Sequence, residues 1–278
     1  MSDVPSVPEI VLNDGVRIPQ LGFGVYKVPS EQTREVVGEA LRVGYRSIDT
    51  AALYGNERGV GEALRDSGLP REEVFVTTKL WNDRQGRDRT LEAFEHSLAE
   101  LGLDHVDLYL IHWPAPAQDL YVETWRTFVE LRDSGRVRSI GVSNFQPAHL
   151  RRLVEETGVV PSLNQVELHP FLQQHEVRAV DAELGIATEA WGPLARGGEL
   201  LHHPVVTAIA QRLGRSPAQV VIAWHLRLGN VVIPKSVTPA RIEENFTVFD
   251  LHLTDEDLAA IAGLDAGLRT GPDPDEMG

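Results

Sequence analysis

Short apolar segments with β-strand character alternate with amphipathic helical segments along almost the whole of this 278-residue chain. The strand-like segments lie at residues 20–24, 46–48, 73–78, 106–111, 137–143, 163–167, 186–190 and 230–233. Apolar residues recur at helical spacing from Ser30 to Leu41 and over 56–67, 87–101, 120–133, 147–156, 174–184 and 217–228. This regular alternation of strand and helix predicts an α/β fold built on a parallel sheet.

Eight such units favour a sheet that closes into a (β/α)8 TIM barrel, a fold that typically takes about 250 residues. No linker or change in composition divides the chain, so we expect one barrel domain over residues 1–278. Within it we expect a short flexible N-terminus and an acidic C-terminal tail. The alternative is an open Rossmann domain, but the glycines of Gly22-Phe23-Gly24 lack the third glycine of that nucleotide-binding motif.

A β-hairpin is predicted before the first unit. EIVL (9–12) and VRIP (16–19) flank Asn13-Asp14-Gly15, and the glycine supplies the positive φ that a tight turn needs. The N-terminal hairpin is therefore part of the expected fold.

Composition excludes several classes of function. The chain has 26 Lys and Arg against 41 Asp and Glu, a formal net charge of −15, which argues against nucleic acid or an anionic membrane as partner. It contains no cysteine, and His169 and the pair His202-His203 lack metal-ligand spacing, so we expect no metal site. No apolar run reaches the ~20 residues of a membrane span and no signal peptide is recognisable, so we expect a cytoplasmic protein.

Polar side chains follow the expected strands, at the rim where the carboxyl ends of barrel strands meet. Barrel enzymes place their active sites at this rim. Tyr54 lies five residues beyond one of these positions and is expected to fold back over the rim. The residues at the strand ends are Asp49, Lys79, His112, Asn144, Gln165, Trp191 and Lys235.

Four of these residues together suit protonation of an oxygen. Asp49 near Lys79 would keep the ammonium charged, and an ammonium beside the Tyr54 hydroxyl favours the phenolate, so we expect a Tyr54 pKa below its usual ~10. His112 could orient a carbonyl group or relay a proton. An alternative is a Schiff-base aldolase that uses Lys79 as its nucleophile.

The motifs around these residues resemble those of the aldo-keto reductases, most closely the bacterial 2,5-diketo-gluconate reductase type. The likeness extends from the N-terminal hairpin to about residue 256. The motifs that carry it are GYRSIDTAALYGNE (44–57), TTKLW (77–81), DLYLIHWP (107–114), SIGVSNF (139–145), NQVELHP (164–170) and IPKSVTPARIEENF (233–246).

The resemblance implies a catalytic tetrad of Asp49, Tyr54, Lys79 and His112. In this scheme Tyr54 donates a proton to the carbonyl oxygen, Lys79 and Asp49 tune its acidity, and His112 orients the carbonyl. A reduced nicotinamide cofactor, bound without a Rossmann motif, would supply the hydride.

The resemblance also implies the cofactor contacts. Lys235 and Arg241 would bind the adenosine 2′-phosphate, which implies NADPH/NADP+ in preference to NAD(H). The alternative is that Arg241 and Glu244, three residues apart on a helix, form only a surface ion pair. The remaining implied contacts are Ser143, Asn144, Gln165, Trp191, Gly192, Leu194, Ser236, Val237, Glu244 and Asn245.

A small carbonyl compound is the implied substrate, with Tyr26, Trp81, His112 and Trp113 lining its pocket. The tail from Leu264 to Gly278 matches the family poorly, so aldehydes, diketones or methylglyoxal are as compatible as 2,5-diketo-gluconate. We expect a monomer. The alternative outside enzymology is a non-catalytic NADP(H)-sensing barrel module.

Overall fold

The computed structural model describes residues 7–277, and the start of the chain, where a short flexible segment is expected, lies outside the described part. Its centre is a sheet of eight parallel strands in the order β10-β9-β8-β7-β6-β5-β4-β3. The strands are β3 (Phe23–Gly24), β4 (Ser47–Asp49), β5 (Phe75–Leu80), β6 (Val106–Ile111), β7 (Val137–Ser143), β8 (Leu163–Glu167), β9 (Ala187–Trp191) and β10 (Val231–Val232). The predicted α/β fold with a parallel sheet is confirmed, and each predicted strand segment overlaps one of these strands.

Hydrogen bonds join the two ends of this strand order. Leu21, just before β3, forms a parallel bridge with Val232 in β10. The amide of Gly22 donates to the Val232 carbonyl at 2.9 Å, and the Val232 amide donates to the Gln20 carbonyl at 2.9 Å. The sheet therefore curls until its first and last strands meet.

The glycines of the Gly22-Phe23-Gly24 segment serve this meeting of strands. A Cβ at Gly22 would lie 3.0 Å from the Ile233 Cγ2 and Ser47 Oγ atoms, and one at Gly24 would lie 3.1 Å from the Ile233 carbonyl oxygen. Glycine allows this close approach because it has no side chain. The two glycines thus have a packing role that needs no dinucleotide motif.

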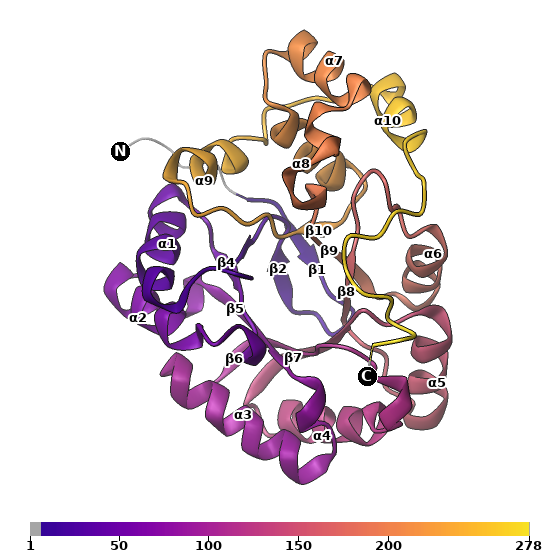
Figure 1. Cartoon of the computed structure of the whole chain (residues 1–278). Helices are drawn as coiled ribbons and strands as arrows, with labels where there is room; N and C mark the ends of the chain where they lie inside the picture. The colour runs from indigo at the N-terminus through magenta and orange to yellow at the C-terminus, as the bar shows by residue number, and fades with distance from the viewer. Residues whose placement is uncertain (1–6, 278) are drawn as a thin grey trace.

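Helices surround the strands in Figure 1, and each helical stretch predicted from sequence overlaps one of them. Two further helices, α7 and α10, were not predicted; α7 packs against α8, and α10 packs against α7. Arg212 of α7 and Asp257 of α10 form an ion pair, which ties these two helices together. The helices are α1 (Ser30–Val43), α2 (Glu57–Ser67), α3 (Arg87–Leu101), α4 (Tyr121–Asp133), α5 (Pro147–Thr157), α6 (His175–Leu184), α7 (Pro204–Leu213), α8 (Pro217–Arg227), α9 (Pro239–Phe246) and α10 (Asp255–Ala262).

The predicted N-terminal hairpin is confirmed as β1 (Glu9–Val11) and β2 (Arg17–Pro19), paired antiparallel. Its buried side chains Leu12 and Ile18 pack in one cluster with Phe75, Leu108 and Leu163 from three strands of the sheet. The hairpin therefore covers the amino-terminal end of the sheet and buries apolar surface there, which leaves the carboxyl end available for a site.

The main core lies between the outer face of the sheet and the helices. Tyr109 of β6 stacks on Phe128 of α4 with ring centroids 4.5 Å apart, and Phe94 of α3 contacts Tyr109 at 5.0 Å. All three side chains are fully buried. This packing holds the strands, and hence the residues at their carboxyl ends, in place.

Candidate active site

Asp49, Lys79 and His112 come together with Tyr54 at the carboxyl ends of β4, β5 and β6. Asp49 is the last residue of β4, Lys79 lies near the end of β5, and His112 follows β6 directly. Tyr54 ends the 3-10 helix η1 (Ala52–Tyr54), which turns back over these strands. Asp49, Lys79 and His112 are buried, and the Tyr54 side chain is half-buried.

Lys79 is the centre of this cluster. Its Nζ atom donates to Asp49 Oδ1 at 2.6 Å and to the Thr50 carbonyl at 2.9 Å, and it lies 3.5 Å from the Tyr54 hydroxyl oxygen. Burial alone would lower the pKa of Lys79, but the neighbouring Asp49 and Tyr54 raise it above its usual value. The ammonium is therefore charged and directed at the phenol.

The Tyr54 phenol keeps its proton more tightly than predicted. Burial raises the pKa of Tyr54 to about 12, although Lys79 lowers it. The expected pKa below 10 is therefore wrong, because loss of solvation around a phenolate outweighs one ammonium in this structure. At neutral pH the hydroxyl is a proton donor that lies beside a cation.

His112 lies against Tyr54, with ring centroids 5.7 Å apart and an edge-on arrangement. Burial, together with the charge of Lys79, lowers the pKa of His112 well below its usual value, so the ring is neutral at physiological pH. Its Nδ1 atom is buried and has no hydrogen-bond partner among the described residues.

Aromatic side chains predicted to line a substrate pocket surround these rings. Tyr26 is half exposed and contacts Tyr54 at a centroid distance of 5.0 Å. Trp81 contacts His112 at 5.1 Å, and the buried Trp113 lies 6.5 Å from the same ring. The structure thus brings all the predicted pocket residues to one place.

A network of amides continues from the tetrad to β7, β8 and β9. Asn144 Nδ2 donates to the His112 carbonyl at 3.0 Å, and Asn144 Oδ1 accepts from Trp191 Nε1 at 2.8 Å. Ser143 Oγ donates to the Gln165 carbonyl at 2.9 Å. The predicted carboxamide and stacking residues are therefore neighbours of the tetrad.

Glu189 of β9 is a member of this network that sequence reasoning missed. Gln165 Nε2 donates both to Asp49 Oδ2 at 2.8 Å and to Glu189 Oε2 at 2.9 Å. Burial, with Asp49 nearby, raises the pKa of Glu189 to about 8. Its position two residues before Trp191 was the only signal in the sequence.

The C-terminal tail is attached to the same rim through Glu167, the last residue of β8. The backbone amides of Thr270 and Gly271 donate to its carboxylate at 2.6 and 3.0 Å. Burial alone would raise the pKa of Glu167, but hydrogen bonds from His169, Thr270 and Gly271 hold it at about 2. The tail runs from α10 past the end of β8 toward α5, as the yellow trace shows (Figure 1). Sequence reasoning missed this contact.

The residues predicted to bind a phosphate lie after β10 and on α9. The Lys235 side chain is exposed overall, but the ammonium is partly shielded from solvent. This shielding and the nearby Lys27 lower the pKa of Lys235. Arg241 lies in the first turn of α9 and is exposed. Among the ion pairs of the described residues, none joins Arg241 to Glu244, so the proposed surface pair is not formed.

The other predicted cofactor residues lie on either side of this patch. Glu244 accepts a hydrogen bond from Ser216 Oγ, and Asn245 is buried beside it on α9. Ser236 is buried and Val237 exposed. Gly192 and Leu194 are half-buried and follow directly after β9.

The sequence matches the model of the aldo/keto reductase family over residues 20–200 and 199–266. An aldo-keto reductase of Mycolicibacterium smegmatis is 58% identical over 267 residues, covering 96% of this chain and 97% of the relative. The methylglyoxal reductase DkgA of Escherichia coli is 54% identical over 270 residues, covering 97% and 98%. The chain belongs to the aldo/keto reductase family.

A solved structure agrees with this assignment. A mutant of Gox0644 in complex with NADPH superposes on this reductase with a TM-score of 0.94 at 50% identity, covering 98% of this chain and 99% of that one. The predicted resemblance is thus confirmed at the level of the family, and the chain spans nearly the whole length of its relatives.

The reductase has a donor set that fits a phosphorylated nicotinamide cofactor. Lys235 and Arg241 offer exposed cations, and Arg241 lies at a helix N-terminus, where the dipole also attracts anions. Trp191 offers a half-exposed flat ring near the tetrad. Within residues 7–277, no group of three or more His, Cys, Asp and Glu side chains could hold a metal ion.

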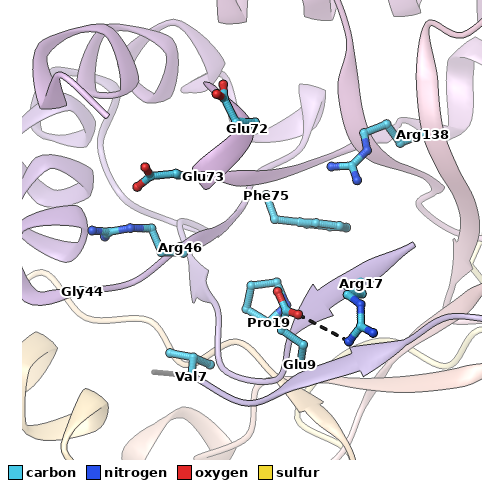
Figure 2. A pocket seen from close by; sticks show the side chains of 10 residues that line it. All are labelled: Val7, Glu9, Arg17, Pro19, Gly44, Arg46, Glu72, Glu73, Phe75 and Arg138. Carbon is cyan, nitrogen blue, oxygen red and sulfur yellow. Dashed lines mark ion pairs between the residues drawn. The ribbon is translucent and has the colours of Figure 1, made fainter. Parts of the chain in front are cut away.

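A cleft of about 510 Å³ lies at the other end of the reductase, beside the hairpin (Figure 2). Its arginines have partners: Arg17 pairs with Glu9 at 3.8 Å, Arg138 pairs with Asp107 at 2.6 Å, and Arg46 donates to the Leu41 carbonyl. None of the predicted site residues lines it.

Among the helices in the described part of the chain, none is long and apolar enough to cross a membrane.

Proposed function

We propose that this chain reduces the carbonyl group of a small aldehyde or dicarbonyl compound, with Tyr54 as the proton donor. Family membership makes it an NADP-dependent oxidoreductase that acts on carbonyl groups, with NADPH/NADP+ as cofactor. The single observation that carries the proposal is the buried Lys79 ammonium, held 2.6 Å from Asp49 and 3.5 Å from the Tyr54 hydroxyl.

The proton step follows from the electrostatics of this cluster. A phenol with a pKa of about 12 keeps its proton at neutral pH until an acceptor arrives. As the substrate oxygen gains negative charge, Tyr54 donates its proton and the fixed Lys79 ammonium stabilises the phenolate that forms. Asp49 keeps Lys79 charged throughout.

His112 orients the substrate in this proposal. A neutral imidazole can donate a single hydrogen bond without competing with Tyr54 as an acid, and the low pKa of His112 keeps it neutral. Its ring lies edge-on to Tyr54 at a centroid distance of 5.7 Å, close enough for one carbonyl oxygen to contact both groups. A protonated His112 would also repel Lys79, which is a further reason for the neutral form.

The cofactor supplies the hydride to the carbonyl carbon when bound. Ser143, Asn144 and Gln165 would hold its carboxamide, Trp191 would stack on the ring, and Lys235 with Arg241 would bind the 2′-phosphate. Gly192, Leu194, Ser236, Val237, Glu244 and Asn245 complete the proposed contacts.

Methylglyoxal is the first substrate to test, because a relative of 54% identity carries the name methylglyoxal reductase. Tyr26, Trp81 and Trp113 give the pocket apolar walls that suit a compact carbonyl compound. The aldolase alternative is disfavoured, since a Schiff base needs a neutral amine and the pKa of Lys79 is raised.

NADPH absorbance in the presence of methylglyoxal, 2,5-diketo-gluconate and simple aldehydes tests the proposal. Oxidation that depends on the carbonyl compound is the expected result. Binding of NADPH with no oxidation by any of them would favour a sensing module instead. We further propose that the curled sheet is a closed (β/α)8 barrel and that the protein is a cytoplasmic monomer.

A further inference from the structure

Gln165 is held by two carboxyl groups at once. Its Nε2 atom donates to Asp49 Oδ2 at 2.8 Å and to Glu189 Oε2 at 2.9 Å. All three side chains are almost completely buried, at 2%, 3% and 1% exposure. The backbone carbonyl of Gln165 accepts hydrogen bonds from Ser143 Oγ and from the backbone N–H of Asn144. The backbone is therefore fixed, and only the side chain of Gln165 could change orientation.

The two carboxyl groups decide which way the Gln165 amide faces. A primary amide nitrogen has two hydrogens, and both are used here. An amide turned by 180° would direct its oxygen at Asp49 Oδ2 with no hydrogen between them, which is unfavourable in a buried site. Toward Glu189 the turned amide would meet a hydrogen only if the carboxyl proton lay on Oε2. An oxygen of Glu189 accepts this bond whether the group is ionised or carries a proton on its other oxygen.

Only the Oε1 atom of Gln165 is then left to meet a ligand. A ligand that contacts Gln165 must therefore present an N–H or O–H donor. The amide nitrogen of a nicotinamide carboxamide is such a donor. With Asp49 alone, one amide hydrogen would be free and the orientation would be less strongly determined.

We propose that Glu189 is a positioning residue that fixes the Gln165 amide with its oxygen facing the cofactor carboxamide. This inference rests on the proposed function, because Gln165 is a proposed cofactor contact. Glu189 itself touches neither cofactor nor substrate and acts through Gln165.

The chain offers a matched control on the other face of the same two strands. Asp181 is also buried and accepts from Asn164 Nδ2 at 3.2 Å and from Thr188 Oγ1 at 2.8 Å. Asn164 and Thr188 precede Gln165 and Glu189 by one residue each and are in register. Because side chains alternate between the faces of a strand, removing the Asp181 carboxyl changes packing without touching Gln165.

The test compares NADPH with its 3-acetylpyridine analogue, which keeps the carbonyl oxygen but lacks the amide nitrogen. The wild type should bind NADPH about tenfold more tightly than the analogue, as expected for one buried hydrogen bond. Glu189→Met should reduce this preference to about threefold or less, and Glu189→Gln, which keeps an acceptor oxygen, should restore it. Asp181→Leu should leave the preference unchanged.

An equal preference in Glu189→Met and the wild type would overturn the inference, as would an equal loss in Asp181→Leu. Absence of any preference for NADPH in the wild type also overturns the inference, whether or not Glu189→Met folds. A wild type that binds neither nucleotide contradicts the proposed function instead.

Discussion

Lys79 Nζ and Asp49 Oδ1 lie 2.6 Å apart at the ends of two adjacent strands, and both side chains are buried. Their separation is determined by the register of β4 and β5, in which Asp49 pairs with Thr77. The ion pair therefore places a cation at a constant distance from the Tyr54 hydroxyl. The proposed chemistry depends on this charged Lys79, whose position is set by the register of β4 and β5.

Asp49→Asn should lower kcat by about 10², because general acid catalysis contributes about 10² to 10⁴ and Lys79 would lose the group that holds it. Steady-state kinetics with methylglyoxal measures the effect. Asp107→Asn is the control, since Asp107 is equally buried but pairs with Arg71 and Arg138 at the other end of the sheet. Equal losses of kcat in both variants would indicate a general effect of a buried charge.

Lys235→Ala and Arg241→Ala should each weaken NADPH binding by about tenfold to a hundredfold, the value of a hydrogen bond to a charged group. NADH lacks the 2′-phosphate, so its affinity should change by less than about threefold. Fluorescence titration with both nucleotides gives the two dissociation constants. Parallel losses for NADPH and NADH would refute the phosphate contact.

Glu167→Gln should destabilise the protein by about 3 kcal/mol at pH 7, since the pKa of Glu167 is lowered from 4.5 to about 2. A lowered pKa means that the folded state favours the carboxylate. This stability is therefore present above pH 4.5 and is lost as the pH falls toward about 2.

Urea unfolding at pH 7 and at successively lower pH measures this difference between wild type and Glu167→Gln. The difference in free energy of unfolding between the wild type and Glu167→Gln should become smaller below pH 4.5. Glu183→Gln serves as the comparison because Glu183 is an exposed carboxylate that pairs with Arg151. If this difference in free energy of unfolding stays constant with pH, Glu167 stabilises the protein through packing and not through its charge.

Gly271→Ala should disturb the aromatic wall of the site. A Cβ at Gly271 would lie 2.5 Å from Trp191 Cη2, so the tail or the indole must move. We expect weaker NADPH binding and a change in tryptophan fluorescence. Gly263→Ala, whose Cβ would come no closer than 3.5 Å to another atom, should behave as the wild type. If Gly271→Ala binds NADPH and fluoresces as the wild type does, the tail does not hold Trp191 in place.

The rim residues could be predicted because each follows a strand whose apolar run is readable in the sequence. Asp49, Lys79 and His112 end or follow such runs, and parallel strands bring their carboxyl ends together. The same reasoning located the hairpin, whose turn residues are specific. Helix α7 was missed because β-branched residues such as Val205, Val206 and Thr207 obscure a helical pattern, whereas α10 has only 8 residues in which a pattern could show.

Contacts between distant segments could not be predicted. Thr270 binds Glu167 across 103 positions of the chain, and no local pattern records such a pair. Glu189 resembles any polar residue in a strand until the sheet places it beside Gln165. The pKa of Tyr54 was predicted in the wrong direction because the degree of burial is a property of the folded chain.

Tyr54→Phe, measured for turnover and for NADPH binding on the same preparation, tests the central claim most directly. The variant should lose turnover by about 10³ while its NADPH dissociation constant stays within about threefold, because only the proton donor is removed. Tyr26→Phe, which alters a neighbouring phenol at a ring distance of 5.0 Å, should retain activity. Turnover of Tyr54→Phe within about tenfold of the wild type would contradict the assignment of Tyr54 as the acid.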